Sequence, residues 1–474
     1  MDTIQAVTTK WVPRDDQSEA VVFGCTREAA GIFAKPGVGK TAIFLYTLNL
    51  LQQHGEAHSA IVIAPLRPLY ATWPAEIEKW AFPFTIGVLH GPKKLDVLTG
   101  PKKDIYLINP EGVDWLCDRI AAGDMPKWID TLACDESTKF KNPQAKRFKA
   151  LKEVLRRFRN RYILTGTPQA RSLEDLWSQV FILDGGKRLG AYITHFRRRF
   201  MVDAAPRGAA YSDWQPAVGA VERVYELISD LCLTVPSPRT EKPLFNPITV
   251  TLPSGAMAEY KRMKRDFYVE LRKGTITAAN AGAKTMKMRQ LTGGFIYDTD
   301  GSTHAVHEAK LDAMIDFIEE LGDEQLLIAV NFQAEAKAVI ARLEKEFKIR
   351  APYFGGGGVS GAAGLEAINE WNAKKLRFIV ANPQSAAHGL NLQHGGSNAL
   401  WYSLTYNWED WEQFNNRLDR VGQENTVVIS VLLADGTIDE QVLDVLDGRG
   451  SADKSLFTIM RKHYEQQKAS GEEA

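Results

Sequence analysis

The sequence predicts an α/β fold in which two doubly wound parallel sheets are separated by a helical middle segment. Short β-rich runs alternate with helical patterns from Ser59 to Thr165, and the same alternation returns between Lys310 and Ala381. Strands separated by helices of this length are typical of parallel sheets that carry helices on both faces. We therefore expect a first lobe over 1–190, helical insertions with an inter-lobe connection over 191–300, and a second lobe over 301–474.

Composition limits the class of protein. With 474 residues the chain is longer than one ordinary domain. Its 58 basic and 58 acidic residues cancel, so any nucleic-acid surface has to be local. The four cysteines are far apart and form no C-x-x-C pair, which argues against a zinc ribbon or a disulfide framework. Because no run of about 18 apolar residues occurs, we expect a cytoplasmic protein without a membrane partner.

A glycine-containing loop lies between a short apolar run and a helical pattern, and it reads Ala34-Lys-Pro-Gly-Val-Gly-Lys-Thr41. Its two glycines would let backbone N–H groups approach a polyphosphate closely. Lys40 would reach the β- and γ-phosphates, and the Thr41 hydroxyl would bind Mg²⁺. The alternative is a glycine-rich turn before an ordinary helix. The predicted nucleotide-binding residues of this loop are Pro36, Gly37, Val38, Gly39, Lys40 and Thr41.

A second candidate nucleotide contact precedes the loop. Gln17 lies 23 residues before Lys40, and its amide can both donate and accept, which suits the edge of an adenine. Trp11 could stack on a base. The alternative for this segment is a solvated N-terminal turn.

Polar clusters fall where apolar strands of the first lobe are predicted to end, which is where parallel sheets bind ligands. The carboxylates of Asp135 and Glu136 terminate one such strand. Asp135 would hold Mg²⁺, and Glu136 would orient or deprotonate the water that attacks a γ-phosphate. The alternative is a solvated turn. A further strand runs into Thr165-Gly-Thr167, whose hydroxyls could sense the metal and the γ-phosphate.

Taken together, these motifs resemble the Swi/Snf-type branch of helicase superfamily two, which is DEAD/DEAH-like, and its compact bacteriophage and prophage versions most closely. The resemblance runs from Gln17 to Glu440. It implies two RecA-like lobes, ATP and Mg²⁺ as cofactors, and ATP bound between the lobes. One departure stands out, because Ser137-Thr138 replaces the Ala-His of the family's usual Asp-Glu-Ala-His. Thr138 would then have to supply the link between the ATP and DNA sites. The motifs that carry the resemblance are A-x-x-G-x-G-K-T, Ala64-Pro-Leu66 with Trp73, Glu76 and Trp80, the run from Asp135 to Asn142, and Leu164-Thr-Gly-Thr-Pro168.

The second lobe has no phosphate loop, so it would act on the nucleotide through Gln413 to Gln423. The pattern Q-x-x-x-R-x-x-R-x-G-Q there matches the resemblance. Arg417 and Arg420 are three residues apart and would share one helix face as arginine fingers. The alternative is a surface arginine pair with Asp419. We also expect Gln413 to bind the nucleotide, Gly389 and Ser385 to lie near phosphates, and the tryptophans from Trp401 to Trp411 to belong to the core.

The middle segment contains a strongly basic run that could follow a DNA backbone, since phosphate contacts supply most sequence-independent affinity. The alternative is a solvated charged face. By resemblance, this run and the segment from Ala191 to Val202 would be helical protrusions. The basic residues are Lys261, Arg262, Lys264, Arg265, Arg272, Lys273, Lys284, Lys287 and Arg289.

These observations lead to the prediction of an Mg²⁺-ATP-dependent translocase on DNA, with duplex DNA as the favoured partner. The alternatives are a strand-separating helicase on DNA or RNA, and a nucleotide-switched nucleic-acid-binding module. We expect a monomer, a possible partner protein that supplies specificity, and the cytoplasm of a bacterial host cell if the chain is phage-encoded.

Overall fold

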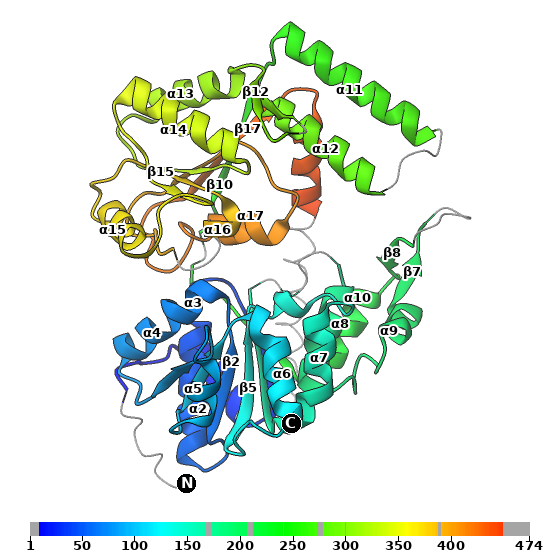
Figure 1. Cartoon of the computed structure of the whole chain (residues 1–474), viewed down its shortest axis with the longest axis vertical. Coiled ribbons are helices and arrows are strands. Elements are labelled where there is room, and N and C mark those ends of the chain that lie inside the picture. Colours follow the sequence, from blue (N-terminus) through cyan, green and yellow to red (C-terminus); the bar gives the residue numbers. More distant parts are fainter. Residues whose placement is uncertain are drawn as a thin grey trace. The chain divides into compact units, whose positions relative to one another are not determined.

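The computed structural model describes residues 9–166, 168, 172–205, 212–239, 241–272, 278–298, 300–386 and 390–448. The chain forms two compact units (Figure 1). The first extends to Pro238, and the second begins at Arg239. Each unit contains its own parallel sheet, so the predicted α/β class is confirmed.

The first unit is built on a seven-stranded sheet in the order β3-β4-β2-β5-β6-β1-β9, and every neighbouring pair is parallel. Both faces are covered, which explains why its central strands read as nearly continuous apolar runs. In β2, Ala60 and Val62 face one core while Ile61 and Ile63 face the other. The strands are β1 (Ala29–Ala34), β2 (Ser59–Ile63), β3 (Ile86–Val88), β4 (Ile105–Ile108), β5 (Ile129–Asp135), β6 (Asn160–Thr165) and β9 (Cys232–Val235).

Helices pack on both faces of this sheet. One core is shared with α1 (Asp15–Cys25), α2 (Lys40–Gln53), α3 (Leu66–Tyr70) and α4 (Thr72–Trp80). The opposite core is shared with α5 (Lys94–Thr99), α6 (Val113–Ala121), α7 (Lys146–Val154), α8 (Glu174–Asp184), α9 (Ile193–Phe200) and α10 (Ala220–Ile228). Three single 3₁₀ turns are η1 (Pro110–Gly112), η2 (Ser137–Phe140) and η3 (Leu155–Arg157).

The chain after Asp184 differs from expectation. The sequence predicted helical insertions over 191–300, but β9 returns to the first sheet and pairs with β1. The approach is close, because a Cβ at Gly31 would lie 2.7 Å from the Cys232 Sγ. A small antiparallel pair, β7 (Met201–Asp203) and β8 (Trp214–Pro216), precedes it. The first unit therefore ends inside the segment assigned to insertions, and the two halves of that segment belong to different units.

The second unit holds a six-stranded parallel sheet in the order β10-β17-β16-β13-β15-β14. Its edge strand β10 was not predicted. Pro247 lies inside β10, and proline is tolerated there because an edge strand leaves one row of N–H groups unpaired. The strands are β10 (Leu244–Val250), β13 (Leu326–Ala329), β14 (Tyr353–Phe354), β15 (Phe378–Ala381), β16 (Asn398–Trp401) and β17 (Val428–Ala434).

Helices also cover both faces of the second sheet. On one face lie α13 (Ala309–Leu321) and α14 (Gln333–Phe347). The other core includes residues of α11 (Ser254–Arg272), α12 (Ala278–Thr292), α15 (Gly361–Asn372), α16 (Pro383–Ala386) and α17 (Trp408–Asn415). The long helices α11 and α12 contact each other, and they are followed by a small antiparallel pair, β11 (Phe295–Tyr297) and β12 (Thr303–Ala305) (Figure 1, green). Among the described helices, none is both long and apolar enough to span a bilayer.

Candidate nucleotide site and the arginine motif

Three strands of the first unit bring the predicted motifs to one edge. β6 lies between β1 and β5, and the register pairs Phe33 with Thr165 and Asp135 with Leu164. The strands are parallel, so the segments that follow them leave the same edge of the sheet. The glycine loop, the acidic pair and the turn after β6 are therefore neighbours.

The glycine loop connects β1 to α2 with the predicted local geometry. Gly37 and Gly39 have φ values of 85° and 99°, a left-handed conformation that glycine adopts without steric cost. The Lys40 side chain is only 9 % exposed, and its Nζ donates a hydrogen bond to the Ala34 carbonyl at 2.7 Å. This hydrogen bond holds the ammonium over the loop, where a P-loop lysine reaches the β- and γ-phosphates. Val38 is buried and Thr41 is half-buried at the start of α2.

Gln17 lies against this loop. It is buried on α1, its Nε2 donates to the Val38 carbonyl at 2.7 Å, and its Oε1 accepts from the Arg14 backbone N–H at 3.0 Å. The alternative of a solvated turn is therefore wrong. Trp11 is buried and packs on Tyr46 with ring centroids 5.3 Å apart, so it belongs to the core rather than to a base-stacking surface.

Asp135 and Glu136 stand at the end of β5. Asp135 is buried; its Oδ2 accepts from the Trp73 Nε1 at 3.0 Å and its Oδ1 from the Glu136 N–H at 3.1 Å. Burial raises the pKa of the Asp135 carboxyl, while the Lys40 charge opposes that rise. The alternative of a solvated turn is wrong for Asp135. Glu136 has a φ of 53°, which strains a residue with a side chain.

The turn after the acidic pair is held by a residue that sequence reasoning missed. Ser137 and Thr138 are both buried, and the Ser137 hydroxyl donates to the Gln179 Oε1 at 2.7 Å. Gln179 belongs to α8, where it follows Ser178 and precedes the apolar run from Val180 to Leu183. Polar residues beside such a run were the available signal, because buried polar groups need partners.

The turn after β6 packs against the glycine loop. A Cβ at Gly166 would lie 3.1 Å from the Pro36 Cδ and 3.4 Å from the Ala34 carbonyl oxygen. Thr165 is buried, and Thr167 lies outside the described residues. In the described part of the chain no three His, Cys, Asp or Glu side chains gather as a metal site.

The arginine motif of the second unit differs from its prediction. α17 ends at Asn415, so Arg417 and Arg420 lie in the turns that follow and do not share a helix face. Arg417 is 7 % exposed, and its guanidinium donates to the Gln413 and Leu390 carbonyls at 2.9 and 3.3 Å. It is therefore no surface residue.

The other members of this motif are also placed within the second unit. The Arg420 guanidinium donates to the Asn391 Oδ1 at 2.7 Å. Asp419 pairs with Arg239 at 2.7 Å. Gln413 is buried, with its Nε2 3.4 Å from the Glu409 Oε1, and Ser385 is exposed. Gly389 lies outside the described residues. Trp401 and Trp411 are buried against each other with centroids 4.6 Å apart, so their prediction as core residues is confirmed.

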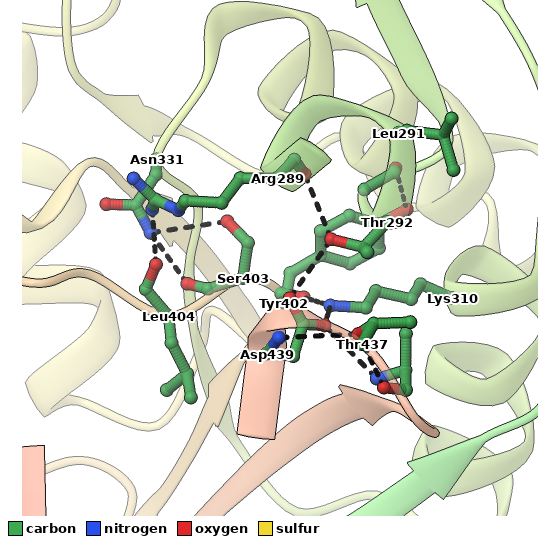
Figure 2. A network of polar contacts seen from close by, with 12 residues as sticks. Arg289, Leu291, Thr292, Lys310, Asn331, Tyr402, Ser403, Leu404, Thr437 and Asp439 are labelled. Atoms are coloured by element: carbon green, nitrogen blue, oxygen red, sulfur yellow. Dashed lines mark hydrogen bonds and ion pairs between the residues drawn. The ribbon is translucent and has the colours of Figure 1, made fainter. Parts of the chain in front are cut away.

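The basic run is split between surface and interior. Lys261, Arg262 and Arg265 are exposed on α11. Arg289 is 9 % exposed on α12, and it donates to the Leu404 carbonyl (Figure 2). Its guanidinium lies over the rings of Phe332 and Tyr406. Lys287 donates to the Tyr297 carbonyl. The burial of Arg289 argues against its prediction as a phosphate contact, whereas Lys287 is half-buried and its predicted contact stays a prediction. The side chains of Arg272 and Lys273 lie outside the described part.

A buried polar network fixes the end of α12 to the second sheet (Figure 2). Lys310 is fully buried, and its Nζ donates to the Asp439 Oδ2 at 2.6 Å and the Tyr402 carbonyl at 3.1 Å. The other Asp439 oxygen accepts from the Thr292 hydroxyl at 3.0 Å. Both charges are thus paired and hydrogen-bonded, the condition under which buried ions are tolerated. These contacts attach the end of α12 to the second unit.

Comparison with known proteins agrees with this arrangement of motifs. The family model described as the SNF2-related domain matches residues 15–293. Putative protein p41 of Acyrthosiphon pisum secondary endosymbiont phage 1 is 30% identical over 456 residues, which cover 91% of this chain and 95% of that protein. The chain belongs to the SNF2-related family. This SNF2-related chain is a DNA-dependent ATPase of the translocase type, and each of its two units carries one parallel sheet with helices on both faces.

Other similarities of the SNF2-related chain are weaker. The human DNA annealing helicase and endonuclease ZRANB3 is 24% identical over 476 residues, which cover 93% of this chain but 40% of that protein. The chain thus spans less than half the length of that relative. The Sulfolobus solfataricus SWI2/SNF2 ATPase core in complex with dsDNA aligns over 96% of this chain and 95% of its own, with 21% identity and a TM-score of 0.43.

Proposed function

We propose that the first unit binds Mg²⁺-ATP at the loop between β1 and α2, and that hydrolysis drives the chain along duplex DNA without separating the strands. The observation that supports this most directly is the convergence of Lys40, the Asp135–Glu136 pair and the Gly166 turn at one sheet edge. The family adds the use of ATP and the action on DNA.

The side chains at this edge fit a magnesium nucleotide. Left-handed Gly37 and Gly39 would let phosphate oxygens approach the backbone of the loop closely, and Lys40 would carry the positive charge. Mg²⁺ would be held by Asp135 and Thr41, with its remaining positions filled by phosphates and water. The bound ion would neutralise charge on the transferring phosphoryl group. Glu136 would orient the attacking water and accept its proton.

Gln17 and the second unit complete the proposal. Gln17 supports the loop through Val38, so we propose that it senses nucleotide binding through that contact as well as through the base. Arg417 and Arg420 would stabilise the charge that develops on the γ-phosphate, and Gln413 holds Arg417 through its carbonyl. Because the relative p41 is encoded by a phage, we further propose that the chain works in the cytoplasm of a bacterial host, as a monomer guided by a partner protein.

The decisive experiment measures ATP turnover alone and with single-stranded DNA, duplex DNA and RNA. We expect duplex DNA to stimulate turnover most. Lys40→Ala should abolish turnover and weaken ATP binding, because it removes a phosphate contact. Glu136→Gln should abolish turnover but retain bound ATP, because it keeps the shape and loses the base.

Two results would contradict the proposal. Near-normal turnover by Glu136→Gln would show that Asp135 and Glu136 are not the hydrolytic pair. ATP-dependent release of a labelled strand from a forked duplex by the protein alone would favour the strand-separating helicase. Displacement of a triplex strand with the duplex left intact would support movement along the duplex.

A further inference from the structure

A single buried amide on α8 joins the loop after β5 to the turn after β6. Gln179 is fully buried; its Nε2 donates to the carbonyls of Pro168 and Asp175, each at 2.7 Å, and its Oε1 accepts from the Ser137 hydroxyl at 2.7 Å. Carbonyl oxygens can only accept, so the amide nitrogen must face them. The amide oxygen then faces Ser137, whose hydroxyl must donate.

Both ends of this connection lie next to groups of the nucleotide site. Ser137 follows Glu136, whose left-handed backbone needs support from its surroundings. Pro168 belongs to the turn in which Gly166 packs against Pro36 and Ala34 of the glycine loop. A displacement of either loop would therefore break a hydrogen bond of a buried amide, which water cannot replace.

We propose that Gln179 and Ser137 are positioning residues that hold Glu136 in its orientation for hydrolysis and tie it to the turn after β6. The inference rests on the proposed role of Glu136. It also accounts for the serine at 137, where the resembled motif has alanine, since an alanine cannot donate to Gln179. In this chain, hydrogen bonds thus connect the residue after the acidic pair, Ser137, to Gln179 and through it to the turn after β6.

The neighbouring residue provides a matched control. Ser178 is also fully buried on α8, and its hydroxyl donates to the Lys141 carbonyl at 2.8 Å. It fastens the same helix to the same stretch of chain without touching Ser137 or Pro168. Loss of either serine hydroxyl removes one buried hydrogen bond, so both substitutions should lower the thermal midpoint to a similar extent.

The test compares Ser137→Ala, Gln179→Leu, their double variant and Ser178→Ala in the full chain, with saturating duplex DNA. We expect Ser137→Ala and Gln179→Leu to lower kcat by about ten- to a hundredfold, the range expected for a misplaced catalytic group. The KM for ATP should stay within about twofold because no phosphate contact is removed. Ser178→Ala should retain the wild-type kcat.

The double variant tests whether the two residues act through one hydrogen bond. Gln179→Leu already removes the partner of Ser137 and the donor to the Pro168 and Asp175 carbonyls, so adding Ser137→Ala should lower neither the thermal midpoint nor kcat much further. Additive losses of kcat in the double variant would overturn the proposal, as would equal rates for Ser137→Ala and Ser178→Ala. Glu136→Gln is measured alongside. If it is inactive while Ser137→Ala is not impaired, this inference fails alone; if it turns over ATP, the proposed function fails.

Discussion

Glu136 is exceptional among the described residues with a positive φ that are not glycine. The others are Ala81, Lys348 and Lys374, and each lies at the end of a helix, where a left-handed residue commonly terminates the helix. Glu136 instead follows a strand. A strained backbone of this kind costs about 1–3 kcal/mol and persists only where the surroundings hold it. The strain therefore falls on the proposed general base.

Asp135 provides a prediction for pH dependence. Burial raises the pKa of its carboxyl, although Lys40 and the bonds from Trp73 and the Glu136 N–H oppose the rise. A raised folded-state pKa stabilises the fold fully below the ordinary value of 3.8, and that stability is lost as the pH rises through the raised pKa. We therefore expect the free energy of unfolding of the wild type to fall relative to that of Asp135→Asn as pH rises. Urea denaturation across a pH series measures this.

An aspartate with the opposite shift serves as the control. Backbone hydrogen bonds from Asp213 and Ala205 lower the pKa of Asp203. Its contribution is present above the ordinary value and is lost as the pH falls. The difference between wild type and Asp203→Asn should therefore change in the opposite direction, and weakly, because the group is exposed. The same sign for both variants would refute the assignment for Asp135.

Among residues, the sequence was most informative where a motif is local. The glycine loop, Lys40 and the acidic pair were placed correctly at one sheet edge, since each follows directly from a strand and the residues after it. Gln179 was missed because its partner Ser137 is 42 residues away. Trp73 was named only as part of the resemblance, and its hydrogen bond to Asp135 was not predicted.

At the level of elements, the helices α11 and α12 separate two kinds of basic residue. Replacing the exposed Lys261, Arg262 and Arg265 together by Gln should reduce the log–log salt slope of DNA binding by at most about three units if all three contact phosphates. Turnover without DNA should survive, since none of the three belongs to the nucleotide motifs. Fluorescence titrations of a labelled duplex at several salt concentrations provide the measurement.

Arg289→Gln is the contrasting variant. It should lower the stability of the second unit and leave the salt slope nearly unchanged, because Arg289 is buried between aromatic rings and bonded to a carbonyl. Arg377 also lies over two rings, those of Phe347 and Phe378, and donates to the Gly322 carbonyl. Arg377→Gln in the same unit is therefore the control variant for Arg289→Gln. If the salt slope fell for Arg289→Gln and not for the triple variant, the distinction between exposed DNA-binding residues and a buried structural arginine would be wrong.

Two elements could not be predicted because their causes are not local. β9 and β10 are short or polar edge strands, and β9 pairs with a strand about 200 residues away along the chain. For the arginine motif, the local pattern predicted a helix that the structure does not contain. Its three-residue spacing is helical, but Arg417 bonds to Leu390 and Arg420 to Asn391, so tertiary contacts override the local pattern after Asn415.

For the whole molecule, the prediction is that hydrolysis needs both units. Arg420→Lys should keep the charge yet lose most of kcat, since an ammonium cannot reproduce the planar guanidinium fork. ATP affinity, measured by fluorescent nucleotide binding, should fall much less. Arg417→Lys should in addition lower the thermal midpoint, because Arg417 supports two buried carbonyls. Equal losses of affinity and rate for Arg420→Lys would assign it a structural role only.

The sequence predicted two α/β units, of which one binds the nucleotide, because the α/β alternation occurs twice and the phosphate loop once. It did not predict the boundary between the two units. This boundary lies between Pro238 and Arg239, and Arg239 is held by Asp419 and the Gln423 carbonyl of the second unit. Such long-range contacts leave no pattern in the neighbouring residues.

The four cysteines have a practical consequence. Burial raises the pKa of Cys25 to about 11 and that of Cys117 to about 12, and it raises those of Cys134 and Cys232 further. The thiolate is the form that maleimide dyes attack, so the native thiols should label slowly. Cysteines introduced at Lys146 and Lys345, whose side chains are 87% and 73% exposed, could then carry a donor and an acceptor dye without removal of any native thiol. Energy transfer between them would test whether the separation of the two units changes during turnover.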